Sequence, residues 1–105
     1  MKKYILKYAG EAINDLLSIY DYIAIEKQDS LSVTNLINKI QDSINSLELF
    51  PYRHKLVDWS PWKEMRLRFL VIGNFFAFYI IVENELIVNV IRIMSCRKNA
   101  QLIFH

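Results

Sequence analysis

Arginine side chains are the groups in this sequence best suited to bind an anion, because the planar guanidinium presents a fork of donors to phosphate or carboxylate. All five arginines lie in residues 51–105, a segment with eight basic and four acidic residues and a net charge of +4. Residues 1–50 carry five lysines and seven acidic residues, a net charge of −2. This asymmetry indicates an anionic partner for the second half, although a charged solvent face on a strand-rich segment gives the same pattern.

Two pairs of basic residues occupy positions where a site is expected. Arg66 and Arg68 are two residues apart in a strand-like run, so they should share one sheet face. There they would contact phosphate, lie in solvent or pair with Glu64. Arg97 and Lys98 directly follow another strand-like run, and strand ends commonly carry site residues; binding a protein partner is an equally good use for them. These four basic residues are the candidate catalytic residues.

Four further residues are candidate substrate-binding positions: Arg53, Lys55, Tyr79 and Arg92. Arg53 and Lys55 belong to a polar, aromatic connection. Tyr79 stands among phenylalanines, a setting that favours core packing. Arg92 lies between two isoleucines, so it either joins the face of the candidate catalytic arginines or is a structural arginine with a buried stem.

Groups that transfer protons near neutral pH are few. His54 and His105 titrate in that range, but a lone histidine in a loop is more often incidental. Cys96 lacks a visible base partner. Trp59 and Trp62 either stack a base, anchor a protein or plug the open end of the core. The two histidines and one cysteine match no metal-ligand spacing, and no Gly-rich phosphate loop occurs, so we expect no metal and no cofactor.

Length and composition place the chain in one class of protein. Its 105 residues, 53% of them hydrophobic and 23% charged, suit one compact folded domain spanning residues 1–105. A single cysteine excludes an internal disulfide and fits a reducing compartment. No apolar run reaches the roughly 18 residues that a membrane span requires, and the N-terminus does not resemble a signal peptide. We therefore expect a cytoplasmic protein that does not bind membranes.

The first half predicts a short strand followed by two helices. Residues 3–8 alternate in polarity, and apolar residues then recur at helical spacing over residues 10–27. A second helix should begin at a cap formed by Asp29-Ser30 or Ser32 and end near Leu49, because Pro51 disfavours a helical residue before it. The short connection between the helices predicts an antiparallel hairpin.

The second half predicts three strands, over residues 64–72, 75–82 and 86–94. Gly73-Asn74 is a strong signal for a two-residue hairpin turn, with at least one positive φ, and residues 83–85 form another tight turn. The element order is β-α-α-β-β-β. The expected fold class is α+β, an antiparallel sheet of about four strands covered on one face by the helical hairpin.

This order of elements and the residues at its joints resemble the RelE/ParE superfamily of toxins from type II toxin–antitoxin modules. The resemblance covers essentially the whole chain and rests on three segments: EAINDLLSIYDYI, INSLELFPYRHKLV and MRLRFLVIGNFFAFYIIVENELIVNVIRIMSCRKN. It implies an antitoxin partner, which we expect to add a short helix or strand to a basic sheet face and an apolar helix groove.

The resemblance implies two alternative activities. RelE-like members cut mRNA on the ribosome through attack of a ribose 2′-OH on the adjacent phosphate, and ParE-like members inhibit DNA gyrase without a nuclease site. Arg66 or Arg68, together with Arg97, stand where relatives carry phosphate-stabilising arginines. Ser95 and Cys96 replace the histidine or tyrosine that many relatives carry, and residues 97–99 read Arg-Lys-Asn instead of Arg-Arg-Asp.

The leading interpretation is a ribosome-dependent endoribonuclease, with ribosome and mRNA as partners. The positive charge of residues 51–105 and the two arginines expected on one sheet face, Arg66 and Arg68, support this interpretation. The alternatives are a ParE-like inhibitor, with DNA gyrase as partner, and a degenerate toxin that retains only antitoxin binding. The missing histidine or tyrosine and the two long helices favour the gyrase alternative.

Overall fold

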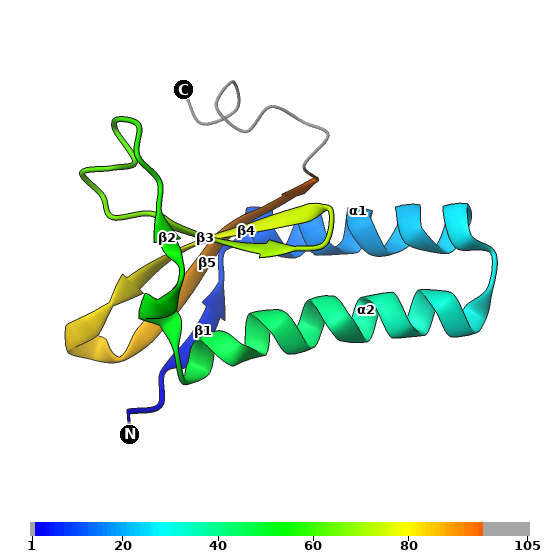
Figure 1. The fold of residues 1–105 in the computed structure, drawn as a ribbon, viewed down its shortest axis with the longest axis horizontal. Helices are drawn as coiled ribbons and strands as arrows, with labels where there is room; N and C mark the ends of the chain where they lie inside the picture. The colour runs from blue at the N-terminus through cyan, green and yellow to red at the C-terminus, as the bar shows by residue number, and fades with distance from the viewer. Residues whose placement is uncertain (1, 96–105) are drawn as a thin grey trace.

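The computed structural model describes residues 2–95 and has the expected α+β architecture, in which a helical hairpin packs on a sheet (Figure 1). The helices and strands follow the predicted order, with one additional short strand. They are β1 (Ile5–Tyr8), α1 (Gly10–Lys27), α2 (Ser30–Asn45), β2 (Lys55–Leu56), β3 (Arg68–Ile72), β4 (Phe75–Val82) and β5 (Ile87–Ser95). Single 3-10 turns occupy Ser46–Glu48, Pro51–Arg53 and Glu83–Glu85.

The helical hairpin forms where the sequence predicts it. Helix α1 spans the expected residues and ends at Gln28, whose left-handed φ of 55° turns the chain. Asp29 caps α2: its carboxylate accepts a hydrogen bond from Leu31 N at 3.3 Å and one from Ser32 Oγ at 2.8 Å. Helix α2 ends at Asn45, and a 3-10 turn continues toward Leu49, so the helical segment reaches the predicted end in two pieces.

The sheet differs from the expected antiparallel one at both edges. Its strand order is β1-β5-β4-β3-β2, and β1 pairs with β5 in parallel. The helical hairpin is the crossover that parallel pairing requires, and strand pairing over so long a sequence separation leaves no local signal. At the other edge, β3 pairs with β2, a short strand in the segment that the sequence analysis treats as a polar, aromatic connection.

Strand β3 begins later than expected, and this changes the position of one candidate residue. The prediction of a strand over residues 64–72 with Arg66 and Arg68 on one face is wrong. Residues 61–66 form turns that end at Arg66, which has a left-handed φ of 58°, and only Arg68 belongs to the strand. Backbone bonds from Arg66 N to Lys63 O and from Leu67 N to Trp62 O hold these turns.

The predicted turn between β3 and β4 is confirmed. Gly73 has a φ of 56°, a conformation that glycine adopts without strain. The two strands it joins pair antiparallel, from Ile72 opposite Phe75 to Arg68 opposite Tyr79. This hairpin places Arg68 and Tyr79 side by side on one face of the sheet.

Apolar side chains pack on both faces of the sheet. The inner core lies between the sheet and the helices, with buried residues Ile23, Ile40, Ile44, Leu70, Tyr79 and Val90 among its members. The outer core covers the other face: Phe69, Phe76 and Phe78 alternate with inner-core residues and pack with Val57, Leu67, Met94 and the half-buried Trp59 and Trp62. The expectation of a basic sheet face is therefore wrong. Trp59 and Trp62 cover this core, which agrees with one of the three roles considered for them in the sequence analysis.

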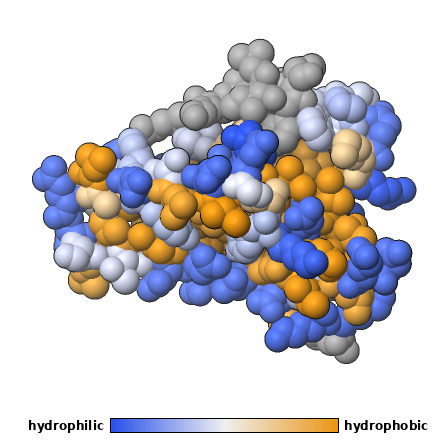
Figure 2. Space-filling view, turned by 180° about the vertical axis from the view of Figure 1, so that it is seen from behind, coloured by the Kyte–Doolittle hydropathy of each residue, from blue (hydrophilic) through white to orange (hydrophobic). Residues whose placement is uncertain are grey.

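Large hydrophobic side chains are also exposed at the surface. Figure 2 shows hydrophobic atoms in a band bordered by hydrophilic ones. On α1 the exposed residues are Ile13, Leu17, Tyr22 and Ile25. Exposed apolar side chains on one helix supply surface that a binding partner can cover.

Candidate functional site

Four of the candidate residues gather at one edge of the sheet, which we call the basic edge: Arg53, Lys55, Arg66 and Arg68. Arg53 ends the 3-10 turn before β2, and Lys55 pairs with Phe69 across β2 and β3. The side chains of Arg53, Lys55 and Arg66 are exposed, and none forms an ion pair with a residue in the described range 2–95. The cationic groups there are consequently available to an anionic partner.

Arg68 is fixed by backbone carbonyls. Its Nη1 atom donates to His54 O at 2.6 Å and to Tyr52 O at 3.3 Å. The guanidinium lies over the Tyr52 ring, 5.1 Å from its centroid. Arg68 shares its side of β3 with Leu70 and Ile72, the side that faces the helices. It thus ties the 3-10 turn to the strand while adding positive charge behind the three exposed cations.

His54 lies behind the basic edge in a partly buried position. Its Nε2 atom is inaccessible and has no hydrogen-bond partner among residues 2–95. The ring meets that of Tyr79 edge-on, with 6.4 Å between centroids. Burial lowers the pKa of His54 below the ordinary 6.5, and the charges of Arg53 and Arg68 lower it further. The imidazole is therefore neutral at pH 7.

Tyr79 is a core residue. It is fully buried, and its hydroxyl donates to Pro51 O at 2.6 Å, which fastens the 3-10 turn to β4. Burial raises the pKa of Tyr79 well above its ordinary value of 10.0. The sequence interpretation that favoured core packing is confirmed by this burial, and the ring presents no surface to a substrate in this structure.

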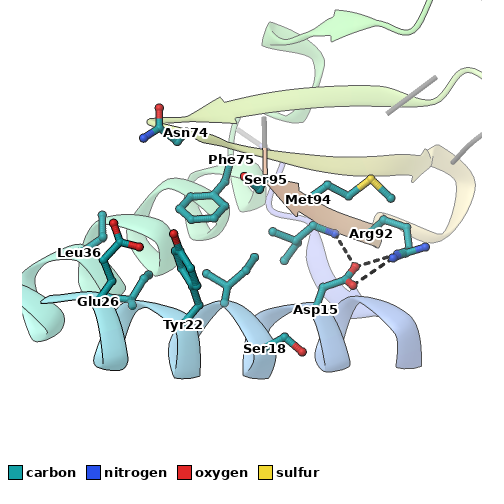
Figure 3. A pocket seen from close by; sticks show the side chains of 13 residues that line it. Asp15, Ser18, Tyr22, Glu26, Leu36, Asn74, Phe75, Arg92, Met94 and Ser95 are labelled. Carbon is teal, nitrogen blue, oxygen red and sulfur yellow. Dashed lines mark hydrogen bonds and ion pairs between the residues drawn. The ribbon is translucent and has the colours of Figure 1, made fainter. Parts of the chain in front are cut away.

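Arg92 lies away from the basic edge, against helix α1 (Figure 3). Its Nε and Nη2 atoms donate to the two Asp15 carboxylate oxygens at 2.8 and 3.1 Å, and Nη1 lies 3.2 Å from Glu11. The same carboxylate of Asp15 accepts a hydrogen bond from Ile93 N at 2.9 Å. Of the two alternatives for Arg92, the structural arginine is the one observed.

Residues 6–100 match a family model described as the ParE toxin of the type II toxin–antitoxin system parDE. This chain belongs to the ParE toxin family. No curated protein matches its sequence. The family membership confirms the resemblance that the sequence motifs indicated.

Solved structures similar to this ParE-family toxin come from toxin–antitoxin complexes. The chromosomal ParDE system of P. aeruginosa gives a TM-score of 0.66 at 19% identity, covering 89% of this chain and 96% of that one. RelBE2 of Mycobacterium tuberculosis gives a TM-score of 0.59 at 15% identity, covering 89% of this chain and 98% of that one. The RelE–RelB complex of Pyrococcus horikoshii gives a TM-score of 0.61 at 10% identity, covering 92% of this chain and 99% of that one. At these identities the likeness establishes a shared fold.

The structure does not test the remaining candidates of this ParE-family toxin. Arg97 and Lys98, with Cys96 and His105, lie outside the described residues 2–95. Within that range no three His, Cys, Asp or Glu side chains gather closely enough to hold a metal ion, and no helix has the length and hydrophobicity needed to cross a membrane.

Asp15 is the polar residue that sequence reasoning missed. It lies in the second turn of an amphipathic helix, where an acidic residue ordinarily faces solvent. A signal was available in Arg92, a charged residue inside an apolar strand, since a half-buried arginine needs an anionic partner. The sequence alone does not say which of the eleven acidic residues that partner is.

The environment of His54 predicts a dependence of stability on pH. Because the folded-state pKa lies below the ordinary value of 6.5, the unfolded chain binds the proton more readily. The free energy of unfolding should therefore be unaffected by this group above pH 6.5 and fall as the pH drops from there through the folded-state pKa. Urea denaturation of the wild type and of His54→Gln at several pH values between 8 and 5 measures the difference in slope. His105→Gln is the control. If His105→Gln removes the pH dependence of the free energy of unfolding and His54→Gln does not, the assignment to His54 is contradicted.

Proposed function

We propose that this ParE-family toxin inhibits DNA gyrase without cutting RNA. The proposal rests on how the fold uses the groups that an RNA cleavage site would need. Tyr79 is buried against Pro51, Arg92 is paired with Asp15, and Arg68 is bound to backbone carbonyls. Tyr52, an exposed phenol beside Arg68, already donates its hydroxyl to Glu83 at 2.8 Å. The match to the ParE family model supports the same activity.

The basic edge is the surface that we propose contacts the target. Arg53, Lys55 and Arg66 offer three positive charges with no ion pair among the described residues to compete for them. Such a surface suits the phosphates of gyrase-bound DNA or an acidic surface of gyrase. Arg97 and Lys98 stay predicted contributors to the same function.

We further propose that an antitoxin binds this chain and suppresses its toxicity. The support is the family itself and the similar structures, which are complexes of a toxin with its antitoxin. The exposed apolar residues of α1 supply surface for such a partner.

Ribosome-dependent mRNA cleavage is the second candidate, and one observation favours it. The neutral imidazole of His54 lies close to Arg53 and Arg68, and a neutral base beside cations is what activation of a ribose 2′-OH requires. In this mechanism Arg66, Arg68, Arg97 and Lys98 would stabilise the phosphorane, and the ribosome would position the mRNA. The buried Nε2 atom would have to become accessible when the substrate binds.

One experiment separates the two functions. Purified toxin is added to a gyrase supercoiling assay and, in parallel, to ribosomes carrying mRNA that is then analysed by primer extension. We expect inhibition of supercoiling and no cleavage of mRNA. The double variant Arg53→Gln/Arg66→Gln should weaken gyrase inhibition by about tenfold or more. Lys7→Gln/Lys39→Gln, which removes the same charge from β1 and α2, is the matched control and should retain inhibition.

The opposite pattern overturns the proposal. Cuts in ribosome-bound mRNA without gyrase inhibition would establish the nuclease. Loss of those cuts in Arg97→Ala but not in Cys96→Ser would then assign the phosphate contact to Arg97. Equal loss of gyrase inhibition in the double variant and its control would assign the effect to net charge and not to the basic edge.

A further inference from the structure

Three side-chain donors converge on the carboxylate of Glu83, in the 3-10 turn between β4 and β5. Its Oε1 atom accepts hydrogen bonds from the hydroxyls of Tyr4 and Tyr52, each at 2.8 Å, and its Oε2 atom accepts one from Lys2 Nζ at 3.3 Å. The two phenol hydrogen bonds lower the pKa of Glu83, and they raise the pKa of Tyr4 to about 12 and that of Tyr52 above its ordinary 10.0. At neutral pH the carboxylate is therefore charged and both phenols are donors. We call these four residues the Glu83 anchor.

Tyr52 connects the Glu83 anchor to the basic edge. It is the middle residue of the Pro51–Arg53 turn, so its position governs the backbone from which Arg53 extends. The guanidinium of Arg68 lies over the Tyr52 ring, 5.1 Å from its centroid, and Arg68 Nη1 donates to Tyr52 O at 3.3 Å. Because Tyr52 is 49% exposed, burial alone does not fix its side chain, and the hydrogen bond to Glu83 supplies the missing restraint.

Tyr4 donates to the same oxygen but belongs to the inner core. It is buried, and its backbone N–H donates to Glu48 O at 2.7 Å. Among residues 2–95, no hydrogen bond or cation–π contact joins Tyr4 directly to a cation of the basic edge. The two tyrosines are thus a matched pair, since each gives Glu83 Oε1 one hydrogen bond and only Tyr52 contacts the basic edge.

We infer that Glu83 is a positioning residue, which through Tyr52 holds the cations of the basic edge in the arrangement that binds the anionic target. The inference rests on the proposed function and assigns it a residue of the opposite charge. Cations that are held in place before binding lose less conformational entropy when the target binds. Charge alone predicts the reverse effect, because removal of a carboxylate makes the surface more positive and strengthens its attraction to an anion.

The first test uses inhibition of gyrase supercoiling by a matched pair of glutamate variants. Glu83→Ala should raise the toxin concentration for half inhibition about fivefold or more, whereas Glu85→Ala, which removes the same charge from the same turn, should change it less than about twofold. Glu85 is exposed, and its side chain forms no hydrogen bond or ion pair within residues 2–95. Glu83→Gln keeps an oxygen acceptor for the phenols and should retain most of the inhibition.

The tyrosine pair separates positioning from stability. Tyr52→Phe keeps the ring beneath Arg68 and should weaken inhibition about threefold or more, whereas Tyr4→Phe should weaken it less than about twofold. Thermal denaturation should show the opposite order, because Tyr4 loses its hydroxyl at a buried position and Tyr52 at an exposed one. A purely structural role would make inhibition follow the melting temperature.

Amide hydrogen exchange tests the Glu83 anchor without any target. The Arg53 N–H donates to Phe50 O at 3.4 Å within the Pro51–Arg53 turn, so its exchange rate measures local opening of that turn. Exchange at Arg53 should be faster in Glu83→Ala and Tyr52→Phe than in the wild type.

Several results would overturn the inference. These are unchanged inhibition in folded Glu83→Ala and Tyr52→Phe, inhibition that follows the melting temperatures, and unchanged exchange at Arg53 in both variants. Stronger inhibition in Glu83→Ala and Glu85→Ala alike would show that Glu83 acts only as a charge. If Glu83→Ala does not fold, the tyrosine pair decides. Failure of the proposed function is distinguishable, since wild-type toxin would then leave supercoiling intact while exchange at Arg53 still tests the anchor.

Discussion

Asp15→Ala should lower the free energy of unfolding by about 3 kcal/mol, because it removes the partner of a largely buried arginine and of a strand N–H together. The side chains of Asp15 and Arg92 are 17% and 26% exposed, and the carboxylate accepts three hydrogen bonds, two from Arg92 and one from Ile93 N. For a domain of this size, 3 kcal/mol corresponds to a melting temperature lower by roughly 10–20 °C. Urea and thermal denaturation followed by circular dichroism measure both quantities.

Two variants separate the hydrogen bonds of Asp15 from simple charge. Asp15→Asn keeps one oxygen acceptor and should lose less stability than Asp15→Ala. Glu11→Gln removes the exposed partner of Arg92, whose side chain is 74% accessible, and should change stability by no more than about 0.5 kcal/mol. A loss in Glu11→Gln as large as in Asp15→Ala would show that general electrostatic attraction holds α1 to β5, and the geometry of the Asp15 contact would then be irrelevant.

Tyr79→Ala should cost about 4 kcal/mol and leave little folded protein at 37 °C, because it opens a large cavity in the inner core. Tyr79 is fully buried and packs beside His54 and below Pro51. Tyr79→Phe keeps the ring and removes only the hydroxyl, so it should cost about 1–2 kcal/mol by leaving Pro51 O without its donor. Denaturation of both variants under identical conditions checks the two values.

The same pair of variants decides whether Tyr79 acts on a substrate. If its role is structural, Tyr79→Phe inhibits growth as strongly as the wild type when equal amounts of folded protein are present. A Tyr79→Phe protein with unchanged stability and lost toxicity would instead place the hydroxyl at the target, and the buried position described here would have to open in the active state.

Local sequence patterns predicted every helix and every long strand. Helix α1 has the predicted bounds, Asp29 caps α2, and Gly73 turns the β3–β4 hairpin, because each of these features depends on spacing or on a backbone preference of neighbouring residues. The same reasoning failed at Arg66. Residues 64–72 alternate as a strand does, but packing of Leu67 into the outer core and the turns before it override the alternation.

The candidate site was predictable in part. The sequence indicated the basic residues, and three of them, Arg53, Lys55 and Arg66, are exposed at one edge. It did not indicate that the Arg68 guanidinium would donate hydrogen bonds to the carbonyl oxygens of Tyr52 and His54, because those residues precede it by fourteen to sixteen positions.

By itself the sequence determined the α+β class and the order of the elements, since these follow from the order of helical and strand periods along the chain. Its motifs resembled those of the family that the family model then showed. Only the tertiary structure decided which charges are free. Asp15 pairs with Arg92 across a separation of 77 residues, whereas the exposed side chains of Arg53, Lys55 and Arg66 form no ion pair within the described range 2–95. The physical reason is that an ion pair forms only between opposite charges that lie within a few ångströms of each other. The packing of apolar faces over the whole fold determines which charges come that close.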